Sequence, residues 1–257
     1  MKGSLFSAKG LSKRFGGVQA VDNVDLTIDE GQVIGLIGPN GAGKTTCFNL
    51  ITGLYTPDSG QFNFQGKDYR PKSPNEVARM GIARTFQNIR LFNSMTALEN
   101  VCVGMHCRTR QGVLGAVFRT PGQRSEEARI EKKALALLHY VGIGQYSNHL
   151  AAQLSYGDQR RLEIARALAS EPKVLALDEP AAGMNATEKL KLRELLLQIR
   201  KDNIAILLIE HDVKLVMGIC DQVTVLDYGK VIEQGTPAHV QQSPAVIEAY
   251  LGGLHHG

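Results

Sequence analysis

The segment GPNGAGKT occupies residues Gly38 to Thr45 of this 257-residue sequence. It fits the pattern G-x-x-x-x-G-K-S/T, follows the apolar run VIGLI at 33–37, and precedes a helix-like stretch at 45–51. In such a strand–loop–helix unit, successive backbone N–H groups point at phosphate oxygens above a helix N-terminus. The sequence therefore predicts a P-loop, the phosphate-binding loop of nucleotide-hydrolysing proteins.

The residue types in this loop have separate chemical roles. Its glycines allow the backbone to fold tightly, Lys44 is expected to reach the β- and γ-phosphates, and the Thr45 hydroxyl is expected to ligate Mg²⁺. The candidate nucleotide-binding residues of the segment are Gly38, Pro39, Asn40, Gly41, Ala42, Gly43, Lys44, Thr45 and Thr46.

Bulk properties exclude several classes of protein. A length of 257 residues suits one large domain or two small ones, and a net charge of +4 argues only weakly for nucleic acid. The four cysteines form no CxxC pair, which is typical of a reduced cytosolic chain rather than of a disulfide framework or zinc site. There is no signal-peptide pattern and no apolar run near the roughly 20 residues that span a bilayer. We expect any link to a membrane to come through a partner.

Hydrophobic patterning predicts an α/β chain with a helical insertion. Residues 4–35 and 61–65 alternate as strands do, and the texture from 73 to about 154 is helical. Within it, Ser73-Pro74 resembles a helix start, and Thr96-Ala97-Leu98-Glu99 fits a capping box. Further expected elements are buried parallel strands at 174–177 and 204–209, helices at 125–140, 158–168 and 187–200, and a closing hairpin at 223–232.

Two acids end the buried strand at 174–177. A strand end opposite a P-loop is where a Mg²⁺-coordinating carboxylate belongs, which suits Asp178. Glu179, one residue further, is placed to orient or deprotonate the attacking water. Alone, Asp178-Glu179-Pro180 could be only the polar end of a strand; the P-loop upstream favours the catalytic interpretation.

The stretch LSYGDQRRLEIARAL at 154–168 identifies the family. A serine and a glycine before a helix present a hydroxyl, a backbone N–H and a positive dipole end to an anion, although Ser155 alone could be a simple helix cap. With the P-loop upstream and Asp178-Glu179 downstream, the stretch resembles the signature motif of ATP-binding cassette (ABC) ATPases. The resemblance covers essentially the whole chain. It implies that Ser155, Tyr156, Gly157 and Asp158 contact the ATP held by a partner subunit.

The resemblance assigns three more site residues. Phe15 resembles the aromatic residue that stacks on adenine, although a single Phe is more often a core residue. Gln87, in RTFQ at 84–87, resembles the Q-loop glutamine that touches Mg²⁺ or the water. His211, in EHD at 210–212, resembles the switch histidine near the γ-phosphate, although a lone His after a strand is usually structural. AAGMN at 181–185 occupies the D-loop position.

The chain departs from the general family pattern at two motifs. Its signature is LSYGDQ rather than the commoner LSGGQ, which makes Tyr156 and Asp158 unusual, and its D-loop ends in Asn185 where Asp is frequent. No catalytic group is missing, so we expect a competent site. The catalytic candidates are Glu179, His211 and Gln87, and the candidate metal ligands are Thr45, Gln87 and Asp178.

The resemblance implies a single domain over 1–257 with the P-loop NTPase core of an ABC ATPase and an antiparallel β edge. The core and edge are expected at about 1–87 and 155–241, an inserted helical subdomain at about 88–154, and a C-terminal tail at 242–257. We expect an exposed loop at 106–122. The end of the tail, including His255 and His256, is expected to be unstructured and to hold no metal.

One P-loop and one signature in a chain imply a head-to-tail dimer of cassettes, with a second ATP-binding subunit that is identical or related. In the family, the groove around the Q-loop docks a short cytoplasmic helix of the permease. Here that groove is 88–95, whose apolar residues and Arg90 fit a helix-in-groove contact, with ordinary packing as the alternative.

The finer resemblance is to the larger ATP-binding subunit of bacterial branched-chain amino acid importers. It rests on RTFQNIRLFNSMTALENV at 84–101, the signature stretch at 154–168, and DEPAAGMN at 178–185. It implies two transmembrane permease subunits, a periplasmic binding protein as an indirect partner, and a peripheral place on the cytoplasmic face of the inner membrane. Leucine, isoleucine or valine would be the substrate; related importers of urea or amides have similar cassettes.

Two rival interpretations remain. A lipopolysaccharide exporter ATPase has the same size and a similar D-loop, but RTFQ at 84–87 favours the importer branch. A soluble ABC protein acting on DNA or ribosomes usually carries two cassettes or a long coiled-coil insertion, and this chain has neither. Arg108, Arg110 and Arg119 could form a nucleic-acid patch, but a solvated loop is the favoured interpretation, and we expect no nucleic-acid partner.

Overall fold

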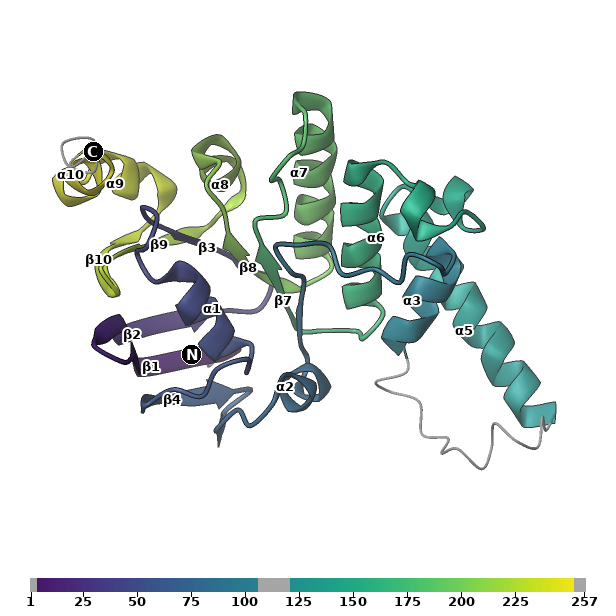
Figure 1. Cartoon of the computed structure of the whole chain (residues 1–257), viewed down its shortest axis with the longest axis horizontal. Helices are drawn as coiled ribbons and strands as arrows, with labels where there is room; N and C mark the ends of the chain where they lie inside the picture. The colour runs from purple at the N-terminus through teal and green to yellow at the C-terminus, as the bar shows by residue number, and fades with distance from the viewer. Residues whose placement is uncertain (1–3, 106–120, 252–257) are drawn as a thin grey trace.

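The computed structural model describes residues 4–105 and 121–251. Its two β-sheets and surrounding helices are shown in Figure 1. The strands are β1 (Phe6–Phe15), β2 (Val18–Ile28), β3 (Val33–Ile37), β4 (Ser59–Phe64), β5 (Lys67–Tyr69), β6 (Ile82–Arg84), β7 (Val174–Asp178), β8 (Ala205–Ile209), β9 (Gln222–Asp227) and β10 (Lys230–Gly235).

The helices lie mainly after the strands of the larger sheet and in the insertion between β6 and β7. They are α1 (Lys44–Ile51), α2 (Pro74–Met80), α3 (Ala97–Met105), α5 (Pro121–Tyr140), α6 (Tyr156–Leu168), α7 (Ala186–Lys201), α8 (Val213–Ile219), α9 (Pro237–Gln242) and α10 (Pro244–Leu251), with short 3-10 turns η2 (Gly144–Tyr146) and η3 (Ala151–Gln153).

The larger sheet has the strand order β10-β9-β3-β8-β7-β6. The five strands from β9 to β6 run parallel, and β10 pairs antiparallel with β9. The P-loop follows β3 and the acid pair ends β7, so both lie at the carboxyl edge of the sheet, where ligands bind in open α/β folds.

Alternating residues of the central strands enter two separate cores. On β8, Ile206 and Leu208 belong to the cluster beneath α6, α7 and α8, while Leu207 and Ile209 belong to the cluster around α1. Because successive strand side chains point to opposite faces, one unbroken apolar run serves both cores. This confirms the prediction of buried parallel strands at 174–177 and 204–209.

The smaller sheet is antiparallel, with the order β2-β1-β4-β5. Helix α1 lies between the two sheets (Figure 1), and its Phe48, Leu50 and Ile51 are fully buried there. The Gly229 N–H donates to Ala42 O at 3.0 Å, and Gly229 O accepts from Asp22 N at 2.8 Å. The β9–β10 turn therefore joins the P-loop to the antiparallel edge.

The predicted capping box opens α3. Thr96 Oγ1 accepts from the Glu99 N–H at 3.2 Å, and Glu99 Oε2 accepts from the Thr96 N–H at 2.7 Å. The backbone hydrogen bonds of Ala97 and Leu98 to His149 O and Ser147 O then fasten this helix start to the segment before α6.

The predicted helical texture after Ser73 is wrong in one place. The helical texture expected from Ser73 is interrupted by β6, a three-residue strand too short to show a period, which pairs with β7. Within the segment expected as a C-terminal tail at 242–257, residues Pro244–Leu251 form helix α10, and its Val246 is only 8% exposed. The subdomain boundaries remain a prediction.

Some expectations lie outside the described residues. These are residues 106–120, including Arg108, Arg110 and Arg119, and residues 252–257, including His255 and His256. Of the expected loop at 106–122, the last two residues belong to α5 instead, which begins at Pro121 rather than at Ser125.

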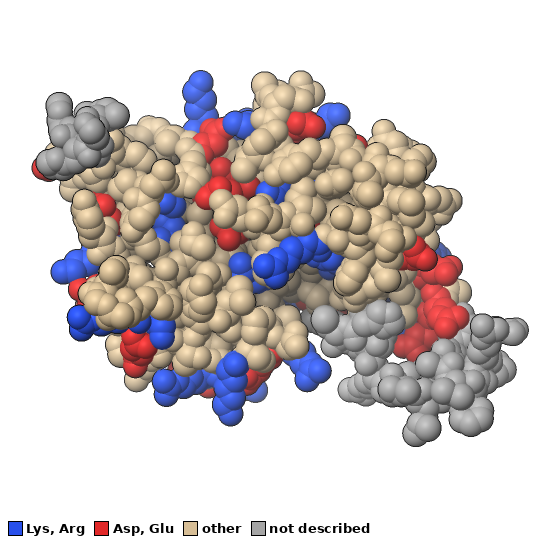
Figure 2. Space-filling model, viewed as in Figure 1, with Lys and Arg blue, Asp and Glu red and all other residues tan. Residues whose placement is uncertain are grey.

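The described surface carries both signs of charge. On the face shown in Figure 2, Lys and Arg side chains gather along the lower edge, below β4 and α2, while Asp and Glu side chains lie in the centre and over α5. None of the helices within 4–105 and 121–251 combines the length and the apolar character that a membrane span requires.

Helix α3 crosses α6 at Gly104 with almost no space between them. A Cβ atom on Gly104 would lie 2.3 Å from Arg166 O and 3.0 Å from Ala169 Cβ. We predict that Gly104→Ala destabilises the protein by about 1–3 kcal/mol, because overpacking outweighs alanine's better helix propensity. Urea unfolding measures this, with Gly17→Ala as the control because nothing lies within 4 Å of the added Cβ. A stabilised Gly104→Ala variant would contradict the packing argument.

Candidate nucleotide-binding and catalytic site

The P-loop backbone requires glycine at its first and last glycine positions. Gly38 has φ of 149° and Gly43 has φ of 97°, both in the region that L side chains rarely adopt. A Cβ would lie 2.0 Å from Leu226 O at Gly38 and 2.2 Å from Ala20 O at Gly43. Hence the loop can adopt this path only without side chains at these two positions.

Lys44 begins α1 and folds back over the loop. Its Nζ donates to Gly38 O and Pro39 O, both at 2.8 Å, and the residue is only 6% exposed. Burial lowers the pKa of Lys44, and the charge of Glu179 partly opposes this shift. The ammonium group is thus held against the loop, within the electrostatic reach of Glu179.

The other candidate P-loop residues differ in exposure. Ala42 is buried, Pro39, Gly43 and Thr46 are partly exposed, and Asn40, Gly41 and Thr45 are exposed. Thr45 lies in the first turn of α1, where backbone N–H groups lack helix partners. An anion placed over this turn would meet exposed loop amides and the Thr45 hydroxyl.

Asp178 and Glu179 leave β7 with different environments. Asp178 is 4% exposed, and burial raises the pKa of its carboxyl, with Arg84 opposing the shift. Glu179 has φ of 48°, a left-handed conformation for a non-glycine residue, and its N–H donates to Ile209 O at 2.9 Å. Such strain costs about 1–3 kcal/mol and is characteristic of functional positions.

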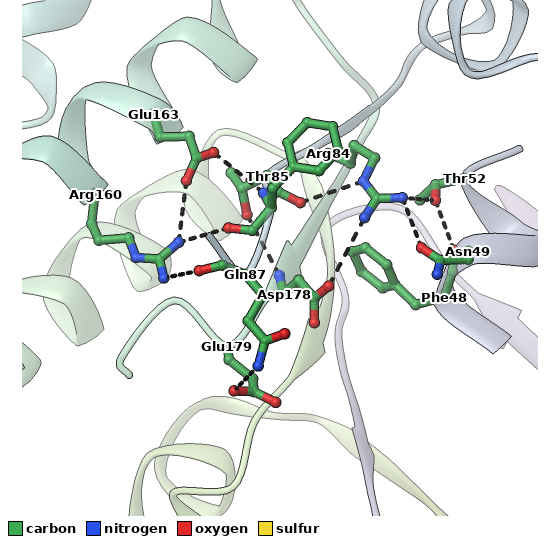
Figure 3. A network of polar contacts seen from close by, with 11 residues as sticks. Phe48, Asn49, Thr52, Arg84, Thr85, Gln87, Arg160, Glu163, Asp178 and Glu179 are labelled. Atoms are coloured by element: carbon green, nitrogen blue, oxygen red, sulfur yellow. Dashed lines mark hydrogen bonds and ion pairs between the residues drawn. The ribbon is translucent and has the colours of Figure 1, made fainter. Parts of the chain in front are cut away.

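The Glu179 carboxylate is held from two sides. Gln87 Nε2 donates to Glu179 Oε2 at 3.0 Å, a contact drawn in Figure 3, and His211 Nε2 lies 2.8 Å from Glu179 Oε1. Gln87 follows β6 and His211 follows β8, so three strand ends supply the three side chains. The structure thus brings together all three catalytic candidates.

Glu210 is a site residue that the sequence analysis missed. It is 4% exposed, and its carboxylate accepts from the N–H groups of Ala181 at 2.7 Å, His211 at 3.1 Å and Asp212 at 3.4 Å. Burial raises its pKa. The D-loop and the His211 backbone are therefore fixed to one carboxylate. A charged residue at the end of the apolar run at 204–209 was the available signal.

Arg84 is a second missed residue, and Figure 3 shows it between α1 and the acid pair. Its Nη1 donates to Thr52 Oγ1 at 2.7 Å and Asn49 Oδ1 at 3.0 Å, and its Nη2 lies 3.9 Å from Asp178 Oδ2. Burial lowers the pKa of Arg84 to about 10. This guanidinium links the P-loop helix to the end of β7.

Phe15 lies at the end of β1 with 43% of its surface exposed, which argues against a core role. The Tyr55 ring stands edge-on to it, with ring centroids 5.3 Å apart, and Lys13 Nζ lies 5.5 Å from the ring centroid. This group offers an open aromatic face. Phe15 was predicted from its motif, whereas Tyr55 was not, because only the fold brings it beside Phe15.

The signature residues begin α6. Ser155 is the N-cap, and its Oγ accepts from the Asp158 N–H at 3.2 Å and donates to Asp158 Oδ2 at 2.8 Å. Asp158 is 8% exposed and pairs with Arg161. Gly157 is buried, and a Cβ there would lie 2.6 Å from Glu188 Oε1. Tyr156 is exposed on the surface.

Asn185, the D-loop departure, is the N-cap of α7. Its Oδ1 accepts from the Glu188 N–H at 3.0 Å, and Glu188 Oε2 accepts from the Asn185 N–H at 2.9 Å. Asn and Asp cap helices about equally well, so the substitution keeps this local structure.

Comparison with known proteins agrees with this geometry. The model of the ABC transporter family matches residues 21–182, and the model described as branched-chain amino acid ATP-binding cassette transporter matches residues 230–256. The chain is 44% identical over 253 residues to the high-affinity branched-chain amino acid transport ATP-binding protein LivG of Salmonella typhimurium, covering 98% of this chain and 99% of that protein. Identity and coverage are the same for BraF of Pseudomonas aeruginosa.

Solved structures give the same result for the fold. The ADP conformation of MJ1267, an ATP-binding cassette of an ABC transporter, superposes with a TM-score of 0.84 at 32% identity, covering 97% of this chain and 99% of that one. The α/β fold with a P-loop is therefore that of an ABC ATPase. The chain belongs to the ABC transporter family, as an ATP-binding cassette that hydrolyses ATP.

Proposed function

We propose that this chain is the ATP-hydrolysing subunit that drives import of branched-chain amino acids through two permease subunits. The observation that carries the substrate class is the 44% identity, along nearly the whole of both chains, to LivG and BraF. The cassette contributes energy rather than substrate recognition, because its described site is one for phosphates.

Glu179 is assigned as the general base. Its carboxylate is positioned by Gln87 and His211, and its strained backbone directs it beyond the end of β7. It would take a proton from the water that attacks the γ-phosphate in line. His211 and Gln87 would orient that water and the carboxylate.

ATP binding is assigned to the P-loop and Phe15. Residues 38–46 would surround the phosphates with backbone N–H groups, and Lys44 would turn from Gly38 O and Pro39 O towards them. The exposed Phe15 ring would stack on the adenine.

Mg²⁺ is the metal that the donor set fits. Thr45, Gln87 and Asp178 offer hydroxyl, amide and carboxylate oxygens, which are hard ligands, and few protein ligands are expected because phosphates and water complete the octahedron. Bound there, the ion would neutralise charge on the phosphates.

A second cassette, identical or related, is proposed to complete the site. Ser155, Tyr156, Gly157 and Asp158 would close over the ATP of that subunit, so that ATP joins the two and hydrolysis releases them. A periplasmic binding protein would deliver the amino acid to the permeases, and no nucleic acid is involved.

The permease contact is assigned to 88–95, with the chain peripheral on the cytoplasmic face of the inner membrane. Phe92 is 47% exposed, while its backbone is fixed by Asn100, which accepts from its N–H at 2.9 Å and donates to its carbonyl at 3.1 Å. A rigid backbone presenting an exposed aromatic side chain fits a docking surface for a short helix.

We predict that Glu179→Gln reduces kcat by about 10²-fold or more, the range for losing a general base, while ATP binding persists. Steady-state phosphate release and gel filtration with ATP measure turnover and the trapped dimer. Glu194→Gln, on the exposed side of α7, is the matched control. Unchanged hydrolysis in Glu179→Gln would refute the assignment.

We predict that Phe92→Ala leaves the ATPase activity of the isolated chain near the wild-type value but reduces amino acid uptake by the assembled importer. The Asn100 contacts that fix the 92 backbone do not need the phenyl ring, so the cassette should stay folded. Uptake in reconstituted vesicles measures the effect. Equal loss of both activities would show that Phe92 is a packing residue.

Affinity purification of the tagged chain from solubilised native membranes tests the partners and substrate class. The expected result is two polytopic permeases and a second cassette, with leucine-stimulated ATPase activity when the binding protein is added. Stimulation by urea or an amide, or co-purification of lipopolysaccharide-export components, would replace the proposed substrate. Recovery with nucleic acid alone would overturn the transport role.

A further inference from the structure

Helix α6 carries a buried ion pair outside the nucleotide site. Arg160 and Glu163 lie three residues apart on the helix, and both side chains are only 2% exposed. Arg160 Nη1 lies 3.3 Å from Glu163 Oε2, and a dashed line in Figure 3 marks this ion pair. Burial raises the pKa of Glu163, and the charge of Arg160 opposes that shift.

This pair holds the main chain on both sides of Gln87. Arg160 donates from Nη1 to Phe86 O at 2.7 Å and from Nη2 to Gln87 O, while Glu163 Oε1 accepts from the N–H groups of Phe86 at 3.3 Å and Arg90 at 3.4 Å. Residues 85–92 have no helix or strand of their own. Four of their main-chain groups, the N–H and carbonyl of Phe86, the carbonyl of Gln87 and the N–H of Arg90, are satisfied by side chains of α6 instead.

A buried ion pair by itself contributes little to the stability of the folded protein. Removing two charges from water is costly, and well-packed apolar side chains of similar volume often stabilise a protein as much or more. The pair instead fixes the geometry of the main chain, because charged hydrogen bonds hold a segment in one register. Here the fixed segment carries the side chain that holds Glu179.

Tyr156 connects the same pair to the D-loop. Its hydroxyl accepts from Arg160 Nη2 at 3.0 Å, and the guanidinium carbon lies 5.4 Å from its ring centroid. A Cβ on Gly183, in the D-loop, would lie 3.2 Å from Tyr156 Cε1. The commoner LSGGQ signature has glycine at this position and no side chain to make these contacts.

We propose that Tyr156, Arg160 and Glu163 are positioning residues that transmit displacement of the signature segment to Gln87, and through Gln87 to Glu179. A shift of α6 would carry the Phe86 and Gln87 carbonyls with it, and thereby change the 3.0 Å contact between Gln87 Nε2 and Glu179 Oε2. Engagement of Tyr156 by the partner cassette would then set the position of the base in this subunit. The inference rests on the proposed roles of Glu179 and of the second cassette.

The decisive variant replaces both charges, Arg160→Met with Glu163→Leu. We expect a melting temperature above that of single Arg160→Met, because no buried charge is left unpaired, but not above the wild type, because the main-chain groups at 86, 87 and 90 lose their partners. ATP affinity should stay within about 2-fold of the wild type, and kcat should fall by about 10-fold or more because the base is misplaced. Amide exchange over 86–90, measured on the isolated nucleotide-free chain, should accelerate by about 10-fold or more because two amides lose their acceptor. Arg193→Met, on the exposed side of α7, is the control.

A conservative variant separates positioning from packing. Tyr156→Phe keeps the ring against Gly183 and removes only the hydroxyl that Arg160 contacts, so we expect a smaller loss of kcat than in the double variant. Single Arg160→Met leaves Glu163 buried without its ion-pair partner and should lower the melting temperature, and the double variant should restore part of that loss.

Wild-type kcat in the stable double variant would overturn the proposal, whether or not exchange over 86–90 accelerates. The failure would be distinct from that of the proposed function. If Glu179→Gln abolishes turnover and the double variant does not, the catalytic assignment stands and only the coupling is refuted. If Glu179→Gln also retains full activity, the role of Glu179 itself is refuted.

Discussion

The site depends on the pairing of β8 between β3 and β7. Ile209 is in register with Leu36 on one side and with Asp178 on the other. Leu36, Ile209 and Asp178 therefore lie side by side across three strands. The P-loop starts two residues beyond Leu36, Glu179 directly follows Asp178, and Glu210 and His211 directly follow Ile209, so all of them leave the same edge of the sheet. A slip of one residue in either ladder would turn these strands' apolar side chains to the wrong core and separate the catalytic groups.

Several features of this edge are unfavourable when considered alone. Glu179 is strained, and Asp178, Glu210 and Arg84 are charged groups in places where water is largely excluded. These groups are tolerated because other parts of the fold hold them in place. Helix α1 holds Arg84 through Thr52, and three backbone N–H groups hold the Glu210 carboxylate. The two apolar cores on either side of the large sheet supply the stability that allows this arrangement.

The tertiary structure gives a contact to each residue that departs from the general family pattern. Asn185 caps α7 as Asp would, with Glu188 completing the capping box. Tyr156 contacts Arg160 and approaches Gly183, contacts that glycine cannot make. Asp158 ties Ser155 to Arg161 within α6. These substitutions therefore belong to a connected set of contacts around the signature helix rather than to a degenerate site.

Helix-start signals could be read directly from the sequence because their contacts are local. The Thr96 capping box and the Ser155 cap satisfy hydrogen bonds three residues apart, and Lys44 reaches back five and six residues within the P-loop, so the spacing in the sequence reflects the geometry. The buried strands at 174–177 and 204–209 were equally predictable, since an unbroken apolar run has few other uses. Short elements such as β6 were missed, because three residues show no period.

Residue type and spacing are enough to identify the kind of protein, through a P-loop, an acid pair after a buried strand, and a signature helix. Which of these groups meet depends on the tertiary structure. Glu179 lies 92 residues from Gln87 and 32 residues from His211 in the sequence, and Arg160 reaches Phe86 across 74 residues. Such contacts depend on strand order and helix packing, which are set by the burial of whole apolar faces and leave no spacing in the sequence.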